Sequence, residues 1–338
     1  MTSDTADTAR PRRRGVRLLL AALAATLAAP LAVTAYLTLG DGRRARFVEY
    51  TMLQPRDMPT AITVAPDGTV WFTLDLAAAI GRVRDGRLER LPKPGQNAEP
   101  LGLAAAPDGG IWYTDAAAGL VARMTASGEV TSYRLGTPLV RLGRLAVAPD
   151  GSAWFAEGTG YSITSVKDGR LTRHVYDSPR GGPYGVAVAG DGTVWATLQE
   201  ANQLLRITPD GTGTTTFDLP RRGSVPTDVA VGPDGTVWFL EFRGNRVGRL
   251  KDGRFDAFEV GRENAGLSGL AVTPDGAVWF GMLRDGSLGR LRGGRLETFR
   301  LPRERARPYS VAADRDGNIW YADITGFVGM VPARDAGG

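Results

Sequence analysis

The sequence contains no cysteine and a single histidine, His174. Without cysteine there is no disulfide bond, no thiolate metal site, no cysteine nucleophile and no lipid-modified cysteine. One histidine excludes metal sites built from several histidines. His174 stands in residues 173–176, which the repeat described below makes the outermost strand of its third unit, so we expect a surface residue far from any site and exclude a Ser-His-Asp hydrolase. A glycine-rich phosphate loop is absent too, because the many Asp-Gly pairs indicate hairpin turns rather than helix starts.

The predicted folded part lacks net charge, although the whole chain of 338 residues has a formal charge of +5. Residues 1–46 contain eight arginines and three aspartates, which accounts for the whole excess. The remaining residues therefore carry equal numbers of basic and acidic side chains, with no net positive field to attract phosphate. The sequence predicts no nucleic-acid partner.

The N-terminal region combines a basic segment with an uncharged one. Residues 1–17 are polar and basic, whereas residues 18–39 contain no charged side chain and are long enough to span a bilayer. This order predicts a cytoplasmic N-terminus and a translocated remainder. Residues 18–39 are either a signal peptide cleaved after Ala35 or an uncleaved transmembrane anchor, and Arg13-Arg14 resembles a twin-arginine signal. We expect an extracytoplasmic protein, secreted or membrane-anchored.

All seven tryptophans recur in register, at spacings of 41, 42, 41, 43, 41 and 41 residues. They are Trp71, Trp112, Trp154, Trp195, Trp238, Trp279 and Trp320. An Asp-Gly pair begins four residues before each of them. A period of about 40 residues with strand-like segments is typical of β-propeller blades.

The first repeat shows how one blade is built. Residues 62–65 alternate and are partly β-branched, which predicts a strand, and residues 70–73 predict a second one. The Asp67-Gly68 pair supplies the positive φ angles of a tight hairpin turn between them. Residues 80–83 and 87–91 predict the third and fourth strands of a four-stranded blade. The tryptophan is expected to fill the gap between neighbouring blades.

The two ends of the chain predict a closed ring. The seventh repeat stops after its third strand, near Val331, and residues 46–51 resemble the missing fourth strand. Pairing of these segments leaves no open sheet edge. We therefore predict an all-β fold, a single seven-bladed propeller over residues 46–332, expected to be a monomer. Residues 40–45 are a predicted linker and residues 333–338 a predicted disordered tail.

The repeated motifs resemble those of a known family. They are Pro-x-Gly-Ile/Val, as in residues 183–186, then Pro-Asp-Gly-x-Val-Trp-Phe, as in residues 233–239. An Ile/Val-Gly-Arg motif, as in residues 247–249, and Leu-Pro, as in residues 219–220, complete the series. Over nearly all of residues 47–332 it resembles the virginiamycin B lyase (streptogramin lyase) family. The resemblance implies a seven-bladed propeller that opens a cyclic depsipeptide by elimination with a divalent metal, usually Mg²⁺.

The resemblance also implies positions for the catalytic side chains. In the family, essential histidines occupy the x of Pro-x-Gly-Ile in the last two blades, where this sequence has Ser268 and Tyr309. The family glutamate two residues before the last histidine corresponds to Arg307. The glutamate four residues after the last tryptophan corresponds to Ile324, with Asp323 beside it. The sequence thus departs from the family at each of these positions.

A cross-strand count predicts which residues surround the channel. The start of the first strand and the end of the second lie on the same face of a blade, and a two-residue Asp-Gly turn would fix their pairing. The pairs so predicted are Arg144 with Glu157, Asp228 with Glu241, Ser310 with Asp323 and Tyr184 with Gln199, joined by Asp115 opposite Gly102. This pattern predicts a polar mouth with aromatic contributions, as small-ligand clefts often have.

The charged pairs allow several interpretations. Arg144 and Glu157 are expected to form a structural ion pair or to contact a ligand. Asp228 and Glu241 should repel each other unless an arginine such as Arg243 neutralises them, they share a proton, or they bind a divalent cation. Hard oxygen ligands of this kind suit Mg²⁺ or Ca²⁺.

Two function classes follow from these residues. The first is a metal-assisted lyase with Asp228 and Glu241 as metal ligands and Tyr184 or Tyr309 as the acid or base. The second is a non-catalytic module at the cell surface that binds a small molecule, a peptide or a protein, with the tyrosines stacking on the ligand or packing across the mouth. The candidate ligand contacts are Arg144, Glu157, Asp115, Arg307, Asp323 and Ser268.

Overall fold

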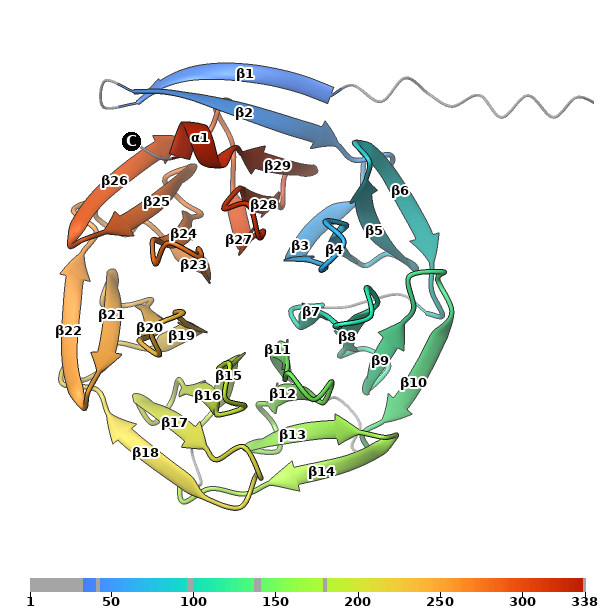
Figure 1. The fold of residues 1–338 in the computed structure, drawn as a ribbon, viewed down its shortest axis with the longest axis vertical. Helices are drawn as coiled ribbons and strands as arrows, with labels where there is room; N and C mark the ends of the chain where they lie inside the picture. Colours follow the sequence, from blue (N-terminus) through green and yellow to red (C-terminus); the bar gives the residue numbers. More distant parts are fainter. Residues whose placement is uncertain (1–32, 41–42, 96–99, 137–140, 179–180, 337–338) are drawn as a thin grey trace, which may run out of the picture. The chain divides into compact units, whose positions relative to one another are not determined.

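The computed structural model of the chain describes residues 33–40, 43–95, 100–136, 141–178 and 181–336. Within these residues the protein consists of antiparallel sheets that stand around a ring, each with its first strand innermost (Figure 1). No helix in the described ranges is long and apolar enough to cross a membrane.

Six of the sheets are four-stranded blades in which consecutive strands pair. Blade 1 is β3 (Met58–Val64), β4 (Val70–Asp75), β5 (Ala79–Arg84) and β6 (Arg87–Pro92); blade 2 is β7 (Leu103–Ala105), β8 (Ile111–Asp115), β9 (Leu120–Met124) and β10 (Val130–Arg134); blade 3 is β11 (Leu142–Val147), β12 (Ala153–Glu157), β13 (Ser162–Lys167) and β14 (Arg170–His174). Blade 4 is β15 (Pro183–Val188), β16 (Val194–Leu198), β17 (Gln203–Ile207) and β18 (Thr214–Asp218); blade 5 is β19 (Pro226–Val231), β20 (Val237–Glu241), β21 (Arg246–Lys251) and β22 (Arg254–Glu259); blade 6 is β23 (Leu267–Val272), β24 (Val278–Met282), β25 (Ser287–Arg292) and β26 (Arg295–Arg300).

Blade 7 joins the two ends of the chain. It contains β27 (Pro308–Ala313), β28 (Ile319–Asp323), β29 (Phe327–Val331) and the N-terminal strand β2 (Arg43–Thr51). Strand β2 pairs with β29 in antiparallel register, with Val48 opposite Met330. The predicted seven-bladed propeller, closed by its N-terminal strand, is therefore confirmed.

The N-terminal strands extend beyond the prediction. A fifth strand, β1 (Val33–Gly40), pairs with β2, which itself begins within the predicted linker 40–45. Strand β1 includes the last seven residues of the predicted 18–39 segment, whereas residues 18–32 lie outside the described part of the chain. A short helix, α1 (Ala333–Ala336), follows β29 where a disordered tail was predicted.

The tryptophans pack between blades, as predicted. Trp71 of blade 1 shares a buried cluster with Ile111 and Tyr113 of blade 2. Trp320 of blade 7 shares another with Phe72 of blade 1, which closes the ring. All seven sheets and all seven core clusters are built from residues 33–331, so the propeller contains every strand and core side chain that ring closure uses.

Sterics explain the Ile/Val-Gly-Arg motif of the third strand. A Cβ on Gly248 would lie 2.2 Å from the ring of Phe239, the residue after Trp238 on the neighbouring strand. The arginine that follows, Arg249, places its guanidinium 5.7 Å from the centre of the Trp238 ring and bonds Asp256 on the fourth strand. The motif therefore lets an aromatic ring reach the core while its arginine covers the tryptophan.

His174 takes the place of an aromatic side chain on the outermost strand of blade 3. In the other blades with this pair, the ring of a tyrosine or phenylalanine packs on the tryptophan, either stacked or tilted. The His174 ring lies 4.4 Å from that of Trp154 and is half-buried. Its Nδ1 lies 3.1 Å from the carbonyl oxygen of Gly211 in blade 4, and its Nε2 lies 2.9 Å from the Ser165 hydroxyl. The prediction of an outermost strand is confirmed, but His174 joins two blades and is not simply a surface residue.

Candidate functional site at the mouth of the channel

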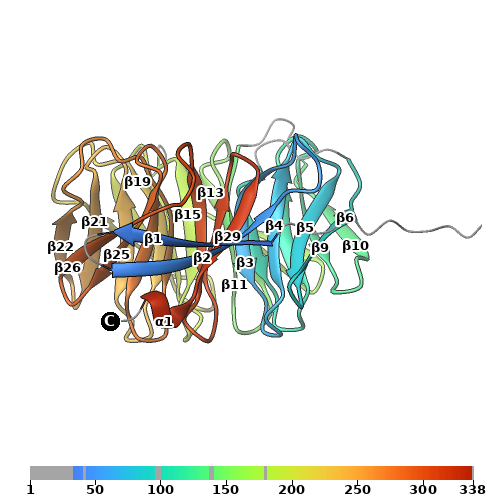
Figure 2. The same ribbon diagram turned by 90° about the horizontal axis from the view of Figure 1, so that it is seen from above.

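The ring has two faces, visible edge-on in Figure 2. The hairpin turns between first and second strands lie on one, here called the turn face. The first strands start, and the second strands end, on the other, here called the mouth face. Because the strands of a meander alternate in direction, the loops between second and third strands and the loops between blades also lie on the mouth face.

The hairpin turns are one residue longer than predicted. In blade 1, the last strand pair is Val64 with Val70, and the Ala65 amide donates to the Thr69 carbonyl oxygen at 2.8 Å. The turn itself is Pro66-Asp67-Gly68, with Gly68 at a φ of 84°. This is a three-residue hairpin with glycine in the left-handed region. The predicted pairing of Val64 with Trp71 is therefore wrong, and Thr63 lies opposite Trp71.

A β-bulge in the first strand shifts the register again at the mouth. In blade 3 the paired residues are Leu142 with Glu157 and then Leu145 with Phe155, so Arg144 has no cross-strand partner. Similar irregularities occur in the first strands of blades 1, 4, 5, 6 and 7. A bulge re-aims a side chain and is common next to functional sites. The predicted opposition of Arg144 and Glu157 is wrong for this reason.

The other predicted pairs fail in the same way. Glu241 faces Pro226 instead of Asp228, and Asp323 faces Pro308 instead of Ser310. In blade 4, Leu198 faces Pro183. In blade 2, the Thr114 amide donates to the Gly102 carbonyl oxygen at 3.0 Å, so Thr114 takes the place predicted for Asp115.

A buried ion pair crosses the channel between blades 3 and 5. Arg144 Nη2 lies 3.4 Å from Asp228 Oδ2, and the two side chains are 11% and 12% exposed. Arg144 also donates from Nη1 to the Leu101 carbonyl oxygen of blade 2, at 3.3 Å, and its guanidinium lies 5.9 Å from the centre of the Tyr309 ring of blade 7. One side chain thus contacts three other blades. A ligand entering from the mouth meets this ion pair.

Electrostatics favour the charged form of Arg144. Burial opposes the guanidinium charge, but Asp228, Tyr184 and Tyr309 outweigh it and raise the pKa of Arg144. Burial raises the pKa of Asp228, although Arg144 opposes that shift. The Nε of Arg144 is buried without a hydrogen-bond partner in the described ranges. The pair is therefore neutral as a whole and leaves one donor unused.

Two predicted tyrosines lie together beside this pair. Burial raises the pKa of Tyr184, and a hydrogen bond with Tyr309 raises it further. A phenol with a raised pKa is a poor general base near neutral pH and keeps its proton for hydrogen bonding. The geometry therefore supports Tyr184 as a hydrogen-bonding and packing group more than as a base.

A cavity of about 320 Å³ opens beside the tyrosines. Its walls include Leu101, Pro183, Tyr184 and Tyr309, and Arg141 supplies a charged group. The volume is at the lower end of the range for small-molecule sites. Apolar and aromatic walls with one cation suit a ligand that has a ring or alkyl group next to a carbonyl or carboxylate.

Three predicted carboxylates lie in the blades rather than in the channel. Asp115 binds Lys93 at 3.0 Å, and both side chains are almost fully buried. Glu157 accepts hydrogen bonds from Thr164 and from Arg173. The third, Glu241, accepts from Ser224 at 2.8 Å and pairs with Arg246. The interpretation that an arginine neutralises Glu241 is correct, although the partner is Arg246 rather than Arg243.

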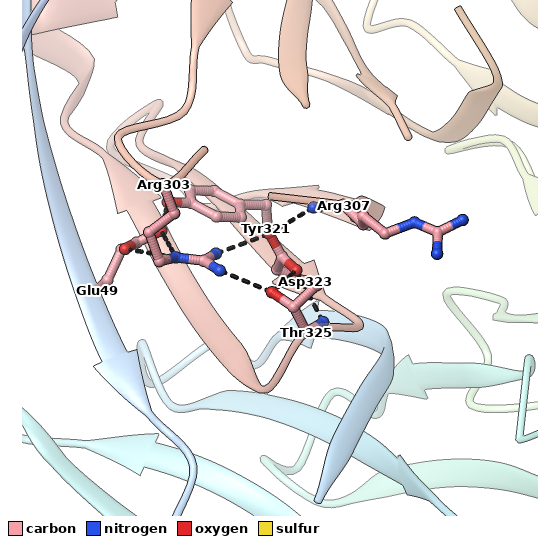
Figure 3. A network of polar contacts seen from close by, with 6 residues as sticks. All are labelled: Glu49, Arg303, Arg307, Tyr321, Asp323 and Thr325. Carbon is pink, nitrogen blue, oxygen red and sulfur yellow. Dashed lines mark hydrogen bonds and ion pairs between the residues drawn. The ribbon is translucent and has the colours of Figure 1, made fainter. Parts of the chain in front are cut away.

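Asp323 holds the closure of the ring together (Figure 3). It is fully buried and accepts hydrogen bonds from Arg303 at 2.7 Å, from the Arg307 amide at 2.8 Å and from the amide and hydroxyl of Thr325. Arg303 also binds Glu49 of the N-terminal strand at 2.9 Å. Asp323 is therefore structural, while the exposed Arg307 side chain points away from the network (Figure 3).

The residues at the mouth do not fit a divalent metal. Asp228 and Glu241, the predicted ligands, are each paired with a separate arginine. The Ser268 hydroxyl donates to the Pro308 carbonyl oxygen at 2.8 Å. In the part of the chain that the structure describes, no group of three or more His, Cys, Asp or Glu is placed to hold an ion. The carboxylate and hydroxyl oxygens of Asp228, Glu241 and Ser268, which a hard cation such as Mg²⁺ would need, are thus already bound within the protein.

The sequence comparison decides the family. The profile of the virginiamycin B lyase family matches residues 42–174 and 145–335, which together cover almost the whole propeller. The chain belongs to the virginiamycin B lyase family. It is 34% identical to virginiamycin B lyase from Nocardia farcinica over 196 residues, which are 58% of this chain and 67% of that protein.

Solved structures of this family match the fold closely. One is a catalytically inactive histidine-to-alanine variant of virginiamycin B lyase from Staphylococcus aureus with quinupristin. It has a TM-score of 0.80 and 26% identity, and covers 85% of this chain and 98% of that one. A streptogramin B lyase structure has a TM-score of 0.78 and 25% identity, and covers 84% and 96%. The predicted resemblance is confirmed.

Sequence reasoning missed the cross-channel pair of Arg144 and Asp228. Arg144 and Asp228 both stand at the glycine of the Pro-x-Gly motif, where blades 4 and 6 carry Gly185 and Gly269. A Cβ on Gly185 would lie 2.5 Å from the Thr227 carbonyl oxygen, which shows how closely adjacent first strands approach. The sequence signal was the replacement of this glycine by a large basic residue in one blade and by an acidic residue in another. Both side chains must project into the channel, so they could have been predicted to pair there.

Proposed function

We propose that this protein is a ligand-binding propeller whose mouth cavity takes a small or peptidic ligand without metal-assisted elimination. The observation that carries this proposal is the Arg144–Asp228 ion pair across the channel, with Tyr184 and Tyr309 beside it. This arrangement supplies aromatic walls and hydrogen-bond donors, but its carboxylate is already neutralised by the arginine. Such a cluster favours recognition over proton abstraction.

The ligand is inferred to contact Tyr309 with an apolar ring and Arg141 with a carbonyl or carboxylate group. Both side chains line the same cavity. Aromatic stacking and a charge-assisted hydrogen bond together give orientation as well as affinity.

Calorimetric titration with quinupristin in Mg²⁺-free buffer tests the binding proposal. Saturable binding is expected, and Tyr309→Ala should weaken it on the order of tenfold or more, since a buried ring contributes about 1.5–3 kcal/mol. Tyr161→Ala is the matched control, because Tyr161 is an exposed tyrosine outside the cavity lining. Equal weakening by both substitutions, or no binding at all, contradicts the assignment of this cavity to the ligand.

A second candidate is the elimination reaction itself. Family membership and the similarity to a lyase solved with quinupristin favour it. In that case the ring-opening step would have to proceed at a mouth with Ser268 and Tyr309 at the positions that the resemblance assigns to histidines. It predicts a product of unchanged mass from a cyclic depsipeptide, detectable by liquid chromatography and mass spectrometry.

We also infer that the propeller works outside the cytoplasm. The support is the basic segment 1–17 followed by the uncharged segment 18–39. Fusion of alkaline phosphatase to the C-terminus of the full chain should give active enzyme, because that enzyme requires export to form its disulfides. An inactive fusion that is present at normal levels would contradict export.

A further inference from the structure

Exposed apolar side chains gather on one face of the ring. In the described part of the chain, the large hydrophobic residues that are exposed are Leu53, Leu76, Tyr161, Val175 and Phe242, between 38% and 78% accessible. Three stand in loops between second and third strands, and Leu53 and Val175 stand in loops that lead to the next blade. Both kinds of loop belong to the mouth face. The turn face has no such side chain among the described residues.

Exposed arginines gather on the same face, in the loops of blades 5 to 7. We call this group the arginine rim: Arg221, Arg222, Arg243, Arg262, Arg284, Arg305 and Arg307. The exposed acidic residues of these loops are Glu263 and Glu304, and the half-buried Asp285 lies 3.5 Å from Arg262. Because residues 47–338 hold equal numbers of basic and acidic side chains, this local excess makes the propeller electrically asymmetric.

The two features meet at Phe242. Its ring is 38% exposed, and the Arg284 guanidinium lies 5.7 Å from its centre. Arg243 follows it directly in the chain. Aromatic rings and long basic side chains are the combination that settles at a membrane–water interface, where the ring enters the headgroup layer and the guanidinium meets phosphate.

We propose that the mouth face docks on an anionic lipid surface. Charge complementarity comes from the arginine rim, and the apolar tips supply shallow insertion. A protein partner would favour one continuous apolar patch, whereas these tips stand singly on loops of different blades, which suits a broad and deformable surface.

This docking goes beyond the proposed ligand binding and does not depend on it. It turns the mouth cavity toward the lipid headgroups. A ligand would then be taken up at the membrane surface, so amphiphilic peptides that concentrate there are favoured.

Vesicle co-sedimentation tests the proposal with residues 33–338, which include every strand and core side chain of the ring. Vesicles of phosphatidylcholine with 30% phosphatidylglycerol are the probe, and pure phosphatidylcholine is the reference. The protein should partition onto the anionic vesicles only, and less so as salt increases. Combining Arg221→Gln, Arg222→Gln, Arg243→Gln and Arg305→Gln should lower the partition coefficient on the order of a hundredfold.

A matched control removes four exposed arginines from the turn face. It combines Arg87→Gln, Arg170→Gln, Arg254→Gln and Arg295→Gln, which changes the net charge by the same amount. Thermal melting of both variants checks that each is folded. The control should keep most of the binding, whereas Phe242→Ser should weaken it through loss of the apolar tip.

Absence of binding to anionic vesicles would overturn the proposal. So would equal losses in the rim variant and the control, or vesicle binding that is unchanged in the rim variant. Binding to soluble polyglutamate without binding to vesicles would also overturn it and would identify an acidic polypeptide as the partner.

Discussion

Ion pairs at the two faces of the ring differ in burial and in repetition. On the turn face, a lysine or arginine at the end of the third strand binds the turn aspartate in several blades, as in Lys167 with Asp150, which are 57% and 50% exposed. On the mouth face, Lys93 with Asp115 is almost fully buried. The carboxylate recurs at the end of the second strand in other blades, as Glu241 and Asp323, but the basic partner comes from a different place each time, Arg246 of a third strand and Arg303 of a loop between blades. The repeat therefore preserves both members of the turn-face pair, whereas on the mouth face it preserves only the carboxylate of these blades.

This difference has energetic consequences. An exposed pair contributes little because water screens both charges. A buried pair is costly to break, since removal of one partner leaves an uncompensated charge in a poorly solvated place. Substitutions at the mouth face should therefore have much larger effects on stability than matched substitutions at the turn face.

The largest expected effect is at the cross-channel pair. Asp228→Ala should lower the free energy of unfolding by about 3–5 kcal/mol, because Arg144 then stays buried without its counter-ion. Urea unfolding measures this change. Replacement of both residues by leucine should recover most of the loss, and a single-variant cost below about 1 kcal/mol would show that the pair is effectively solvated.

Ring closure should be the next most sensitive place. Glu49→Gln removes the charge that binds Arg303 at 2.9 Å and that accepts a hydrogen bond from the Tyr321 hydroxyl at 2.6 Å. The expected loss is about 1–3 kcal/mol, since a charge-assisted bond becomes a neutral one. Hydrogen exchange of β2 and β29 should increase more than that of blade 3. Uniform exchange in all blades would contradict a local closure effect.

A turn-face pair should contribute least. Hydrogen bonds from Lys167 and, to a smaller extent, from Ser152 lower the pKa of Asp150 to about 2. Lys167→Ala should raise that pKa part of the way toward its usual value of about 4, visible by NMR titration, and should change stability at neutral pH less than Asp228→Ala and Glu49→Gln do, because water already screens the pair. A lowered carboxyl pKa stabilises the fold above the unfolded value, and this stabilisation is lost as the pH falls toward the folded value. A loss as large as that of Asp228→Ala would remove the contrast between the two faces.

His174 should add a pH dependence that belongs to neither face. Burial lowers its pKa below the usual value. The unfolded chain therefore binds the proton more readily, so stability is fully present above about pH 6.5 and declines as the pH falls toward the folded pKa. His174→Phe, which restores the aromatic pair of other blades, should remove this decline between pH 7 and pH 5 in thermal melts. An unchanged decline in the variant would assign it to other groups.

The sequence predicted the ring better than the mouth. The tryptophan period and the resemblance of residues 46–51 to a fourth strand predicted blades and closure, because both depend on local patterns that every repeat restates. The cross-strand pairs failed because an Asp-Gly pair serves turns of two or three residues and because bulges leave no clear trace in one sequence. The contact of Arg144 with Asp228 depends on distant blades meeting across the channel, which local patterns do not encode.

The most direct test is to incubate quinupristin with the propeller, with and without Mg²⁺, and to follow it by liquid chromatography and mass spectrometry. It asks whether the protein binds a ligand at the mouth without catalysing metal-assisted elimination. The account predicts an unchanged chromatogram in both samples, because Ser268 and Tyr309 replace the histidines that the resemblance implies, and because Asp228 and Glu241 are each paired with an arginine. A new peak of unchanged mass that requires Mg²⁺ would contradict it, and would show that the family reaction proceeds with Ser268 and Tyr309 at the positions of the histidines.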